Sequence, residues 1–206
     1  MRKIVLSVMV LISASLSLQA ADSSSIHLIS STESKLWLSG TSTLHPYGST
    51  STLTQISAEV SADAVDATDV ARRGPLTHFD LIIPVKGLKS GESGLDKNLY
   101  KALKEEQSPE IHFHLIQYKA MTVLEDGALS FQATGALSIA GAQKDIVLTG
   151  TAKPAADYLL LDGEYKLLMS DYGVKPPTLM FGAIKVGDPV VVHFHLKFVI
   201  KKGEMQ

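Results

Sequence analysis

The stretch from Asp188 to Lys201 constrains the fold of this chain more than any other segment, because apolar residues recur there at every second position. Side chains of a β-strand point alternately to opposite faces, so the pattern predicts a long strand with one apolar face. That face carries Val190, Val192, Phe194, Leu196, Phe198 and Ile200, and the other carries Val191, His193, His195, Lys197, Val199 and Lys201. Because the apolar face needs a partner surface and the backbone needs paired neighbours, the segment predicts a larger sheet.

The same alternation recurs along most of the chain and predicts further strands. These are expected at residues 26–29, 35–39, 53–65, 76–85, 111–118, 129–139, 145–151 and 158–170. We therefore expect an all-β fold in which a curved antiparallel sheet closes around an apolar interior. A length of 206 residues is sufficient for one such domain.

Residues 86–109 interrupt this alternation and have the pattern of one short amphipathic helix. Apolar side chains recur at helical spacing at Leu95, Leu99, Ala102 and Leu103. Ser93 and Asp96 have the spacing of a capping box, and Pro109 ends the segment. The single apolar stripe predicts a helix that packs across one end of the barrel, either as a structural plug or as a mobile lid.

The N-terminus has the features of a secretory signal peptide. Arg2 and Lys3 precede an apolar run over residues 4–18, and Ala20 and Ala21 provide small residues at the cleavage point. The run is short and rich in serine for a membrane anchor. We expect residues 1–21 to be removed and residues 22–206 to form a periplasmic domain without stable membrane insertion.

The composition agrees with export and argues against nucleic acid as a partner. The chain contains no cysteine, so its core has to supply the stability that disulfides give many exported proteins. Removal of Arg2 and Lys3 changes the formal net charge from −2 to −4, and the remaining basic residues are scattered. Phosphate contacts require clustered Lys and Arg, so binding of nucleic acid is not expected.

Several segments together resemble one known family. They are GTSTLHPYG at 40–48, VKGLKSGESGLDKNLYKALKEEQSPEIHF at 85–113, GALSIAGAQKDIVLTG at 135–150, SDYGVKPP at 170–177 and VGDPVVVHFHL at 186–196. In their order and spacing they are similar to the YceI-like family, from about Trp37 to Phe198. The resemblance implies a secreted bacterial protein with a lipocalin-like, eight-stranded antiparallel β-barrel. It also implies that a polyisoprenoid or similar long apolar chain binds inside the barrel.

On this interpretation the ligand is a lipid, and its binding residues fall into two groups. The inward face of the strands offers Leu81, Ile83, Phe113, Leu115, Phe131, Leu137, Leu167, Met169, Phe194 and Leu196. Near the rim, Met180 and Phe181 are expected to gate the mouth, and His45 is expected to meet the polar end of the ligand. Trp37 is a further candidate, although it can equally plug one end of the core. His45 can equally bond to a loop backbone. A homodimer is compatible with these features but not required by them.

Two other functions remain open at this point. His112 with His114, and His193 with His195, are two apart on expected strands, so each pair could give two imidazoles to one zinc or copper ion. Both pairs lie opposite the apolar faces, where solvated histidines are common. The third hypothesis is a structural or stress-protective domain without a ligand. Catalysis is not expected, because the chain lacks cysteine, a G-x-S-x-G elbow and phosphate-binding glycine motifs.

Overall fold

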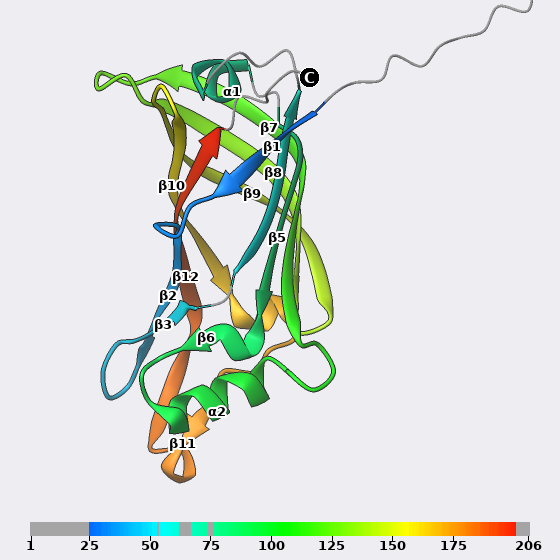
Figure 1. The fold of residues 1–206 in the computed structure, drawn as a ribbon. Coiled ribbons are helices and arrows are strands. Elements are labelled where there is room, and N and C mark those ends of the chain that lie inside the picture. The colour runs from blue at the N-terminus through cyan, green and yellow to red at the C-terminus, as the bar shows by residue number, and fades with distance from the viewer. Residues whose placement is uncertain (1–24, 53, 62–66, 74–75, 201–206) are drawn as a thin grey trace, which may run out of the picture.

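The computed structural model describes residues 25–52, 54–61, 67–73 and 76–200 (Figure 1). The expected signal peptide at residues 1–21 lies outside the described residues, as do Leu53 and residues 62–65 of the expected strand 53–65. Within the described ranges, every helix is too short or too polar to cross a lipid bilayer.

Antiparallel strands close into a barrel in the spatial order β1, β4, β5, β7, β8, β9, β10 and β12. Their bounds are β1 Ser25–Ser30, β4 Gln55–Ser61, β5 Leu76–Pro84, β7 Glu110–Val123, β8 Leu129–Ile139, β9 Ala142–Pro154, β10 Tyr158–Leu168 and β12 Ile184–Ile200. The ring is closed because β12 pairs with β10 on one side and with β1 on the other. The fold confirms the expected closed antiparallel barrel of about eight strands.

Strand β12 is the longest strand and pairs with two different strands along one of its edges. Its C-terminal part pairs with β1, and its N-terminal part pairs with β2. A small branch continues from there through β2 Lys35–Ser42, β3 Tyr47–Ser51 and β6 Leu88–Lys89, while β11 Thr178–Leu179 pairs with the start of β12. Tyr47 and Gly48 pair with Gly40 and Ser39, so β2 and β3 form a hairpin.

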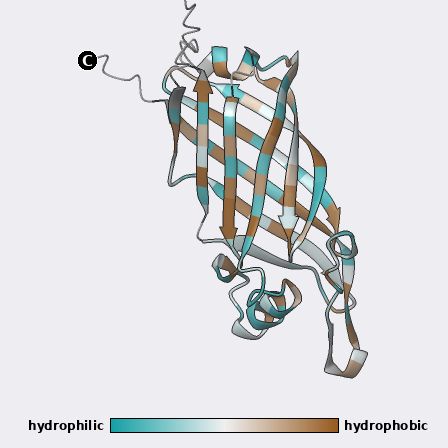
Figure 2. Ribbon diagram, turned by 90° about the vertical axis from the view of Figure 1, so that its right-hand side faces the viewer, coloured by the Kyte–Doolittle hydropathy of each residue, from teal (hydrophilic) through white to brown (hydrophobic). Residues whose placement is uncertain are grey.

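Strand β8 shows how the sequence distinguishes inside from outside. Its residues alternate strictly between buried and partly exposed, and the buried set is Leu129, Phe131, Ala133, Gly135, Leu137 and Ile139. In Figure 2, hydrophobic and hydrophilic residues also follow one another along the strands that face the viewer. Each large apolar side chain that is removed from water stabilises the fold by about 1.5–3 kcal/mol, so a shift of register by one residue would be very costly.

In the described part of the chain, two α-helices lie at opposite ends of the barrel, whereas one was expected (Figure 1). The expected helix is α2, Ser93–Ala102, and the second is α1, Ala67–Arg73. Helix α1 is short and buries little more than Val70 and Ala71, so its sequence carries only a weak helical period. We refer to the two ends of the barrel as the α1 end and the α2 end.

The predicted capping box of α2 is wrong. Glu92 is the N-cap residue, and Ser93 already lies in the first turn of the helix. The Asp96 carboxylate accepts hydrogen bonds from the backbone N–H and the hydroxyl of Ser90, at 2.8 and 2.7 Å. These bonds hold the pKa of Asp96 below its ordinary value. Asp96 therefore ties the start of α2 to the loop that precedes it.

Candidate functional site

The interior of the barrel contains a cavity of about 190 Å³. The inward side chains of all eight ring strands except β1 and β4 contribute to its wall, together with residues of β2, β3, β6 and α2. All ten expected interior residues lie in this wall: Leu81, Ile83, Phe113, Leu115, Phe131, Leu137, Leu167, Met169, Phe194 and Leu196. Their contact with a ligand stays a prediction.

Three aromatic rings in the wall cover glycines instead of filling the interior. Phe131 and Gly150 are paired across β8 and β9, and a Cβ atom at Gly150 would lie 2.9 Å from the Phe131 ring. Phe194 covers Gly163 in the same way, and Phe113 covers Gly135. Because each glycine lacks a side chain, the ring can lie against the wall where a Cβ would otherwise stand. This arrangement leaves room along the barrel axis.

Tyrosines provide the polar atoms of the cavity wall, and reasoning from the sequence missed them. Tyr47, Tyr118, Tyr165 and Tyr172 all contribute to the lining. Burial raises the pKa of both Tyr118 and Tyr172 to about 12, and it also raises the pKa of Tyr47. These hydroxyls are thus neutral at ordinary pH. None of the described lining residues is an acid, a lysine, an arginine or a histidine, so the wall carries no formal charge.

A second hollow of about 390 Å³ lies beside the cavity and has a different chemistry. Hydroxyl groups dominate its lining, from Ser30, Ser31, Thr32, Ser34, Ser51, Thr52 and Thr54. Leu36 and Leu196 line both spaces, so the two hollows adjoin at these side chains. The two hollows place a hydroxyl-rich surface next to an apolar one.

Helix α2 covers one end of the cavity and is fixed to the barrel by polar contacts. Leu99 and Leu103 face the cavity. The Tyr100 hydroxyl lies 2.9 Å from the Leu88 carbonyl oxygen and 2.7 Å from the Lys89 ammonium. These contacts support the plug interpretation of the helix, with Leu99 and Leu103 as its inner surface.

The expected rim residues do not lie in the cavity wall. Trp37 points outward from β2, since its neighbours Leu36 and Leu38 take the inward positions, and it stacks on His193 with ring centroids 5.1 Å apart. His45 is exposed in the loop after β2, and its Nδ1 lies 2.7 Å from the Pro46 carbonyl oxygen. The hypothesis that Trp37 plugs the core is therefore wrong, whereas the loop-backbone contact of His45 is confirmed.

The predicted gate at Met180 and Phe181 is wrong for Phe181. Its side chain is fully exposed and its φ is 54°, because it sits in the short turn between β11 and β12. This hairpin projects from the α2 end of the barrel in Figure 1 instead of folding back over it. The side chain of Met180 lies outside the described part of the structure.

The two His-x-His pairs also remain apart. Strand β7, which carries His112 and His114, pairs with β5 and β8, whereas β12 pairs with β10, β1 and β2. His193 and His195 on β12 therefore cannot join the first pair at one ion. Both pairs face outward, and each of these imidazoles has a carboxylate within 3.5 Å.

A comparison with models of protein families shows to which family this barrel belongs. The model described as the YceI-like domain matches residues 27–198. The chain belongs to the YceI-like family. None of the curated proteins matches its sequence.

Solved structures show the same YceI-like fold at low sequence identity. Burkholderia cenocepacia BcnA has 14% identity and a TM-score of 0.62, with 80% of this chain and 95% of that chain covered. A polyisoprenoid binding domain from Saccharophagus degradans has 12% identity and a TM-score of 0.61, covering 85% and 98%. A Campylobacter jejuni YceI protein has 20% identity and a TM-score of 0.53, covering 72% and 82%.

Proposed function

We propose that this YceI-like protein binds a long apolar chain, a polyisoprenoid or a similar lipid, inside its barrel. The cavity wall carries this proposal: it is built of hydrocarbon and neutral tyrosines, and its aromatic rings lie over glycines so that the centre stays open. The family membership and the related fold of the Saccharophagus degradans polyisoprenoid binding domain support the same ligand class.

The size of the cavity favours a slender ligand. Sites for drug-sized molecules usually measure roughly 300–1,000 Å³, and this cavity measures about 190 Å³. A chain of linked isoprene units is narrow, and each unit contributes roughly 3–4 kcal/mol on burial before ordering costs. A few units therefore suffice for tight binding without a polar contact.

The neighbouring hydroxyl-rich hollow is the place where we expect the polar end of the ligand. Ser and Thr hydroxyls can donate and accept hydrogen bonds, which suits an alcohol, a quinone carbonyl or a phosphate ester. Leu36 and Leu196 line both spaces, so a ligand that extends from the cavity into the hollow would pass along these two side chains. We further propose that the protein works in the periplasm as a carrier, store or scavenger of such lipids and that it catalyses no reaction.

Native mass spectrometry of the protein purified from its own host tests this function directly. We expect a bound species whose mass, after organic extraction, corresponds to an isoprenoid or other long-chain lipid. Titration of stripped protein with a polyprenol and with a straight-chain fatty alcohol of equal length then measures the preference. Protein that never carries lipid and binds neither probe would contradict the proposal.

A matched pair of variants on β8 ties the binding to the cavity. Ala133 is buried in the wall, and Ala136 on the same strand faces outward. Ala133→Phe should fill the space of about one isoprene unit and weaken binding about 100-fold or more, because 1.4 kcal/mol is tenfold in affinity. Ala136→Phe should bind as the parent does. If Ala133→Phe does not fold, the smaller Ala133→Val gives a graded form of the same test.

A further inference from the structure

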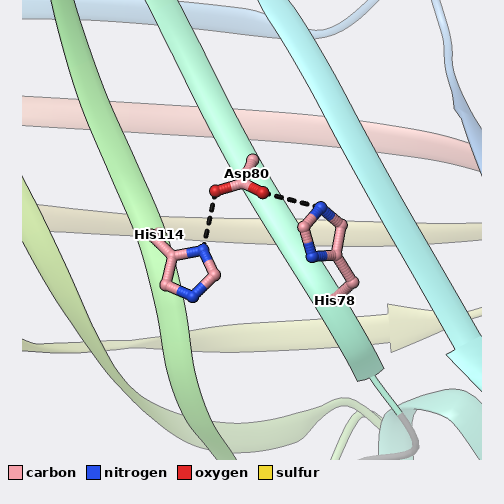
Figure 3. Close-up of side chains that lie close together, drawn as sticks. All are labelled: His78, Asp80 and His114. Atoms are coloured by element: carbon pink, nitrogen blue, oxygen red, sulfur yellow. Dashed lines mark hydrogen bonds and ion pairs between the residues drawn. The ribbon is translucent and has the colours of Figure 1, made fainter.

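Three side chains on the outer surface of the barrel meet at one point, away from the lipid cavity (Figure 3). His78 and Asp80 come from β5, and His114 comes from β7. The Asp80 carboxylate bridges the two imidazoles: Oδ2 lies 2.6 Å from His78 Nε2, and Oδ1 lies 2.7 Å from His114 Nδ1. The ligand atoms of the three residues all lie within 4.8 Å of one another.

The register of the sheet fixes this arrangement. His78 and Asp80 are two residues apart on β5 and therefore share its outer face. Asp80 is directly paired with His114 across the antiparallel ladder between β5 and β7. The adjacent residues Phe79 on β5 and Phe113 on β7 point inward and pack in the core. The three polar side chains thus stand on a rigid base that the core holds in place.

We propose that His78, Asp80 and His114 form a binding site for a divalent late transition-metal ion, of the class of Zn²⁺ or Cu²⁺. Two imidazole nitrogens and one carboxylate oxygen are ligands that these ions favour, and water completes a four-coordinate sphere. Bonds of about 2.0–2.2 Å to all three atoms need only small side-chain rotations from the present positions. One negative carboxylate and two neutral imidazoles leave the bound ion with a net charge of about +1, which the exposed position tolerates.

Solvent access allows such an ion to enter and leave. The side chains of His78, Asp80 and His114 are 38%, 32% and 57% exposed. The ion would replace the N–H protons that now donate hydrogen bonds to the carboxylate, because a coordinating nitrogen has to present its lone pair. The site does not depend on the lipid proposal, since none of its three residues lines the cavity.

Other histidine–carboxylate contacts on the barrel are pairs, and one of them is a close match for a control. His195 Nδ1 lies 2.6 Å from Asp162 Oδ1, across β12 and β10. Among the residues that the structure describes, only the group of His78, Asp80 and His114 brings three possible metal-ligand residues together. A pair such as His195 and Asp162 can form a hydrogen bond but offers only two metal ligands. The group of His78, Asp80 and His114 offers three.

Isothermal titration of the untagged, chelator-treated protein with zinc chloride, and separately with copper(II) chloride, tests the proposal. We expect one ion per chain, with copper bound more tightly than zinc. His78→Gln and His114→Gln should each weaken the affinity by at least about tenfold. His195→Gln, which removes the histidine of the matched pair, should leave the affinity unchanged.

A second readout separates coordination from a change in folding. The bound copper should give an electron paramagnetic resonance spectrum with coupling to nitrogen that is reduced in both glutamine variants. In the absence of metal, the unfolding temperatures of these variants should match that of the parent, and added zinc should raise the unfolding temperature of the parent alone. The proposal is overturned if the parent binds neither metal, or if His195→Gln weakens binding as much as the other two substitutions do.

Discussion

Phe194 on β12 and Gly163 on β10 are directly paired across the antiparallel ladder, and the aromatic ring covers the glycine. A side chain at position 163 would overlap the Phe194 ring and would lie 2.8 Å from the Thr149 carbonyl oxygen. The same relationship recurs at Phe131 with Gly150. The width of the cavity therefore depends on residues that have no side chain at all.

The first prediction concerns this pair. Gly163→Ala should push the Phe194 ring into the cavity, destabilise the protein by about 1–3 kcal/mol and weaken binding of a lipid chain. Urea unfolding and a polyprenol titration measure the two effects. Gly94→Ala is the control, because a Cβ there meets nothing within 4 Å, and its stability should be at least that of the parent. If the double variant Gly163→Ala with Phe194→Leu binds no better than Gly163→Ala, the steric explanation fails.

The second prediction compares two adjacent leucines of β10. Leu167 is buried in the cavity wall, whereas Leu168 is 40% exposed on the outer face. Leu167→Ala should cost about 2–3 kcal/mol of unfolding free energy, at the low end for a buried leucine because empty space already adjoins it. Leu168→Ala should change stability by no more than about 0.5 kcal/mol. Equal losses in chemical denaturation would show that the assignment of inside and outside on β10 is incorrect.

The third prediction concerns Tyr118, whose hydroxyl donates a hydrogen bond to the Ala71 carbonyl oxygen at 3.2 Å. Burial raises the pKa of Tyr118 from 10.0 to about 12, so the folded protein favours the neutral phenol. Its contribution to stability is complete below pH 10 and is lost as the pH rises from 10 through about 12. The difference in tyrosinate absorbance between the parent and Tyr118→Phe should show this late titration.

The control for that titration uses the same substitution. Tyr118→Phe should lose about 1 kcal/mol at neutral pH, because the Ala71 carbonyl loses its partner. Between pH 10 and pH 12 the stability of Tyr118→Phe should also fall less than that of the parent. A difference spectrum that titrates at the ordinary pKa of tyrosine would mean that the ring at position 118 is open to water.

The fourth prediction concerns the anchor of α2. The bonds from Ser90 hold the pKa of Asp96 below its ordinary value, so they stabilise the fold above the pKa of the unfolded chain and are lost as the pH falls through the lower folded pKa. Asp96→Ala should therefore lower the midpoint of urea unfolding at pH 7 but have much less effect in strong acid. Hydrogen exchange should also become faster in residues 93–102. If exchange there is unchanged, Asp96 does not hold the helix in place.

The main features of the fold follow from short-range patterns, because apolar residues recur at every second position in a strand that has one apolar face. That period identifies the inward residues of β8 and β12, and with them Phe131 and Phe194 of the cavity wall. It does not reveal which glycine faces which ring, because the register between β8 and β9 and between β10 and β12 sets those contacts. The tyrosines of the wall were missed because tyrosine, with an apolar ring and a polar hydroxyl, occurs on both buried and exposed faces of strands.

The sequence by itself determined that the chain forms strands with one apolar face around a shared apolar interior, because the alternation of side chains shows which face of each strand is removed from water. Only the tertiary structure decided which side chains on the outer surface of the barrel contact one another. It placed Trp37 on His193 instead of in the core, and it separated the two His-x-His pairs. It also brought His78 and Asp80 to His114 through the register of β5 and β7. Outward residues carry no hydrophobic period that would report their neighbours, so strand order and register alone set which polar groups meet.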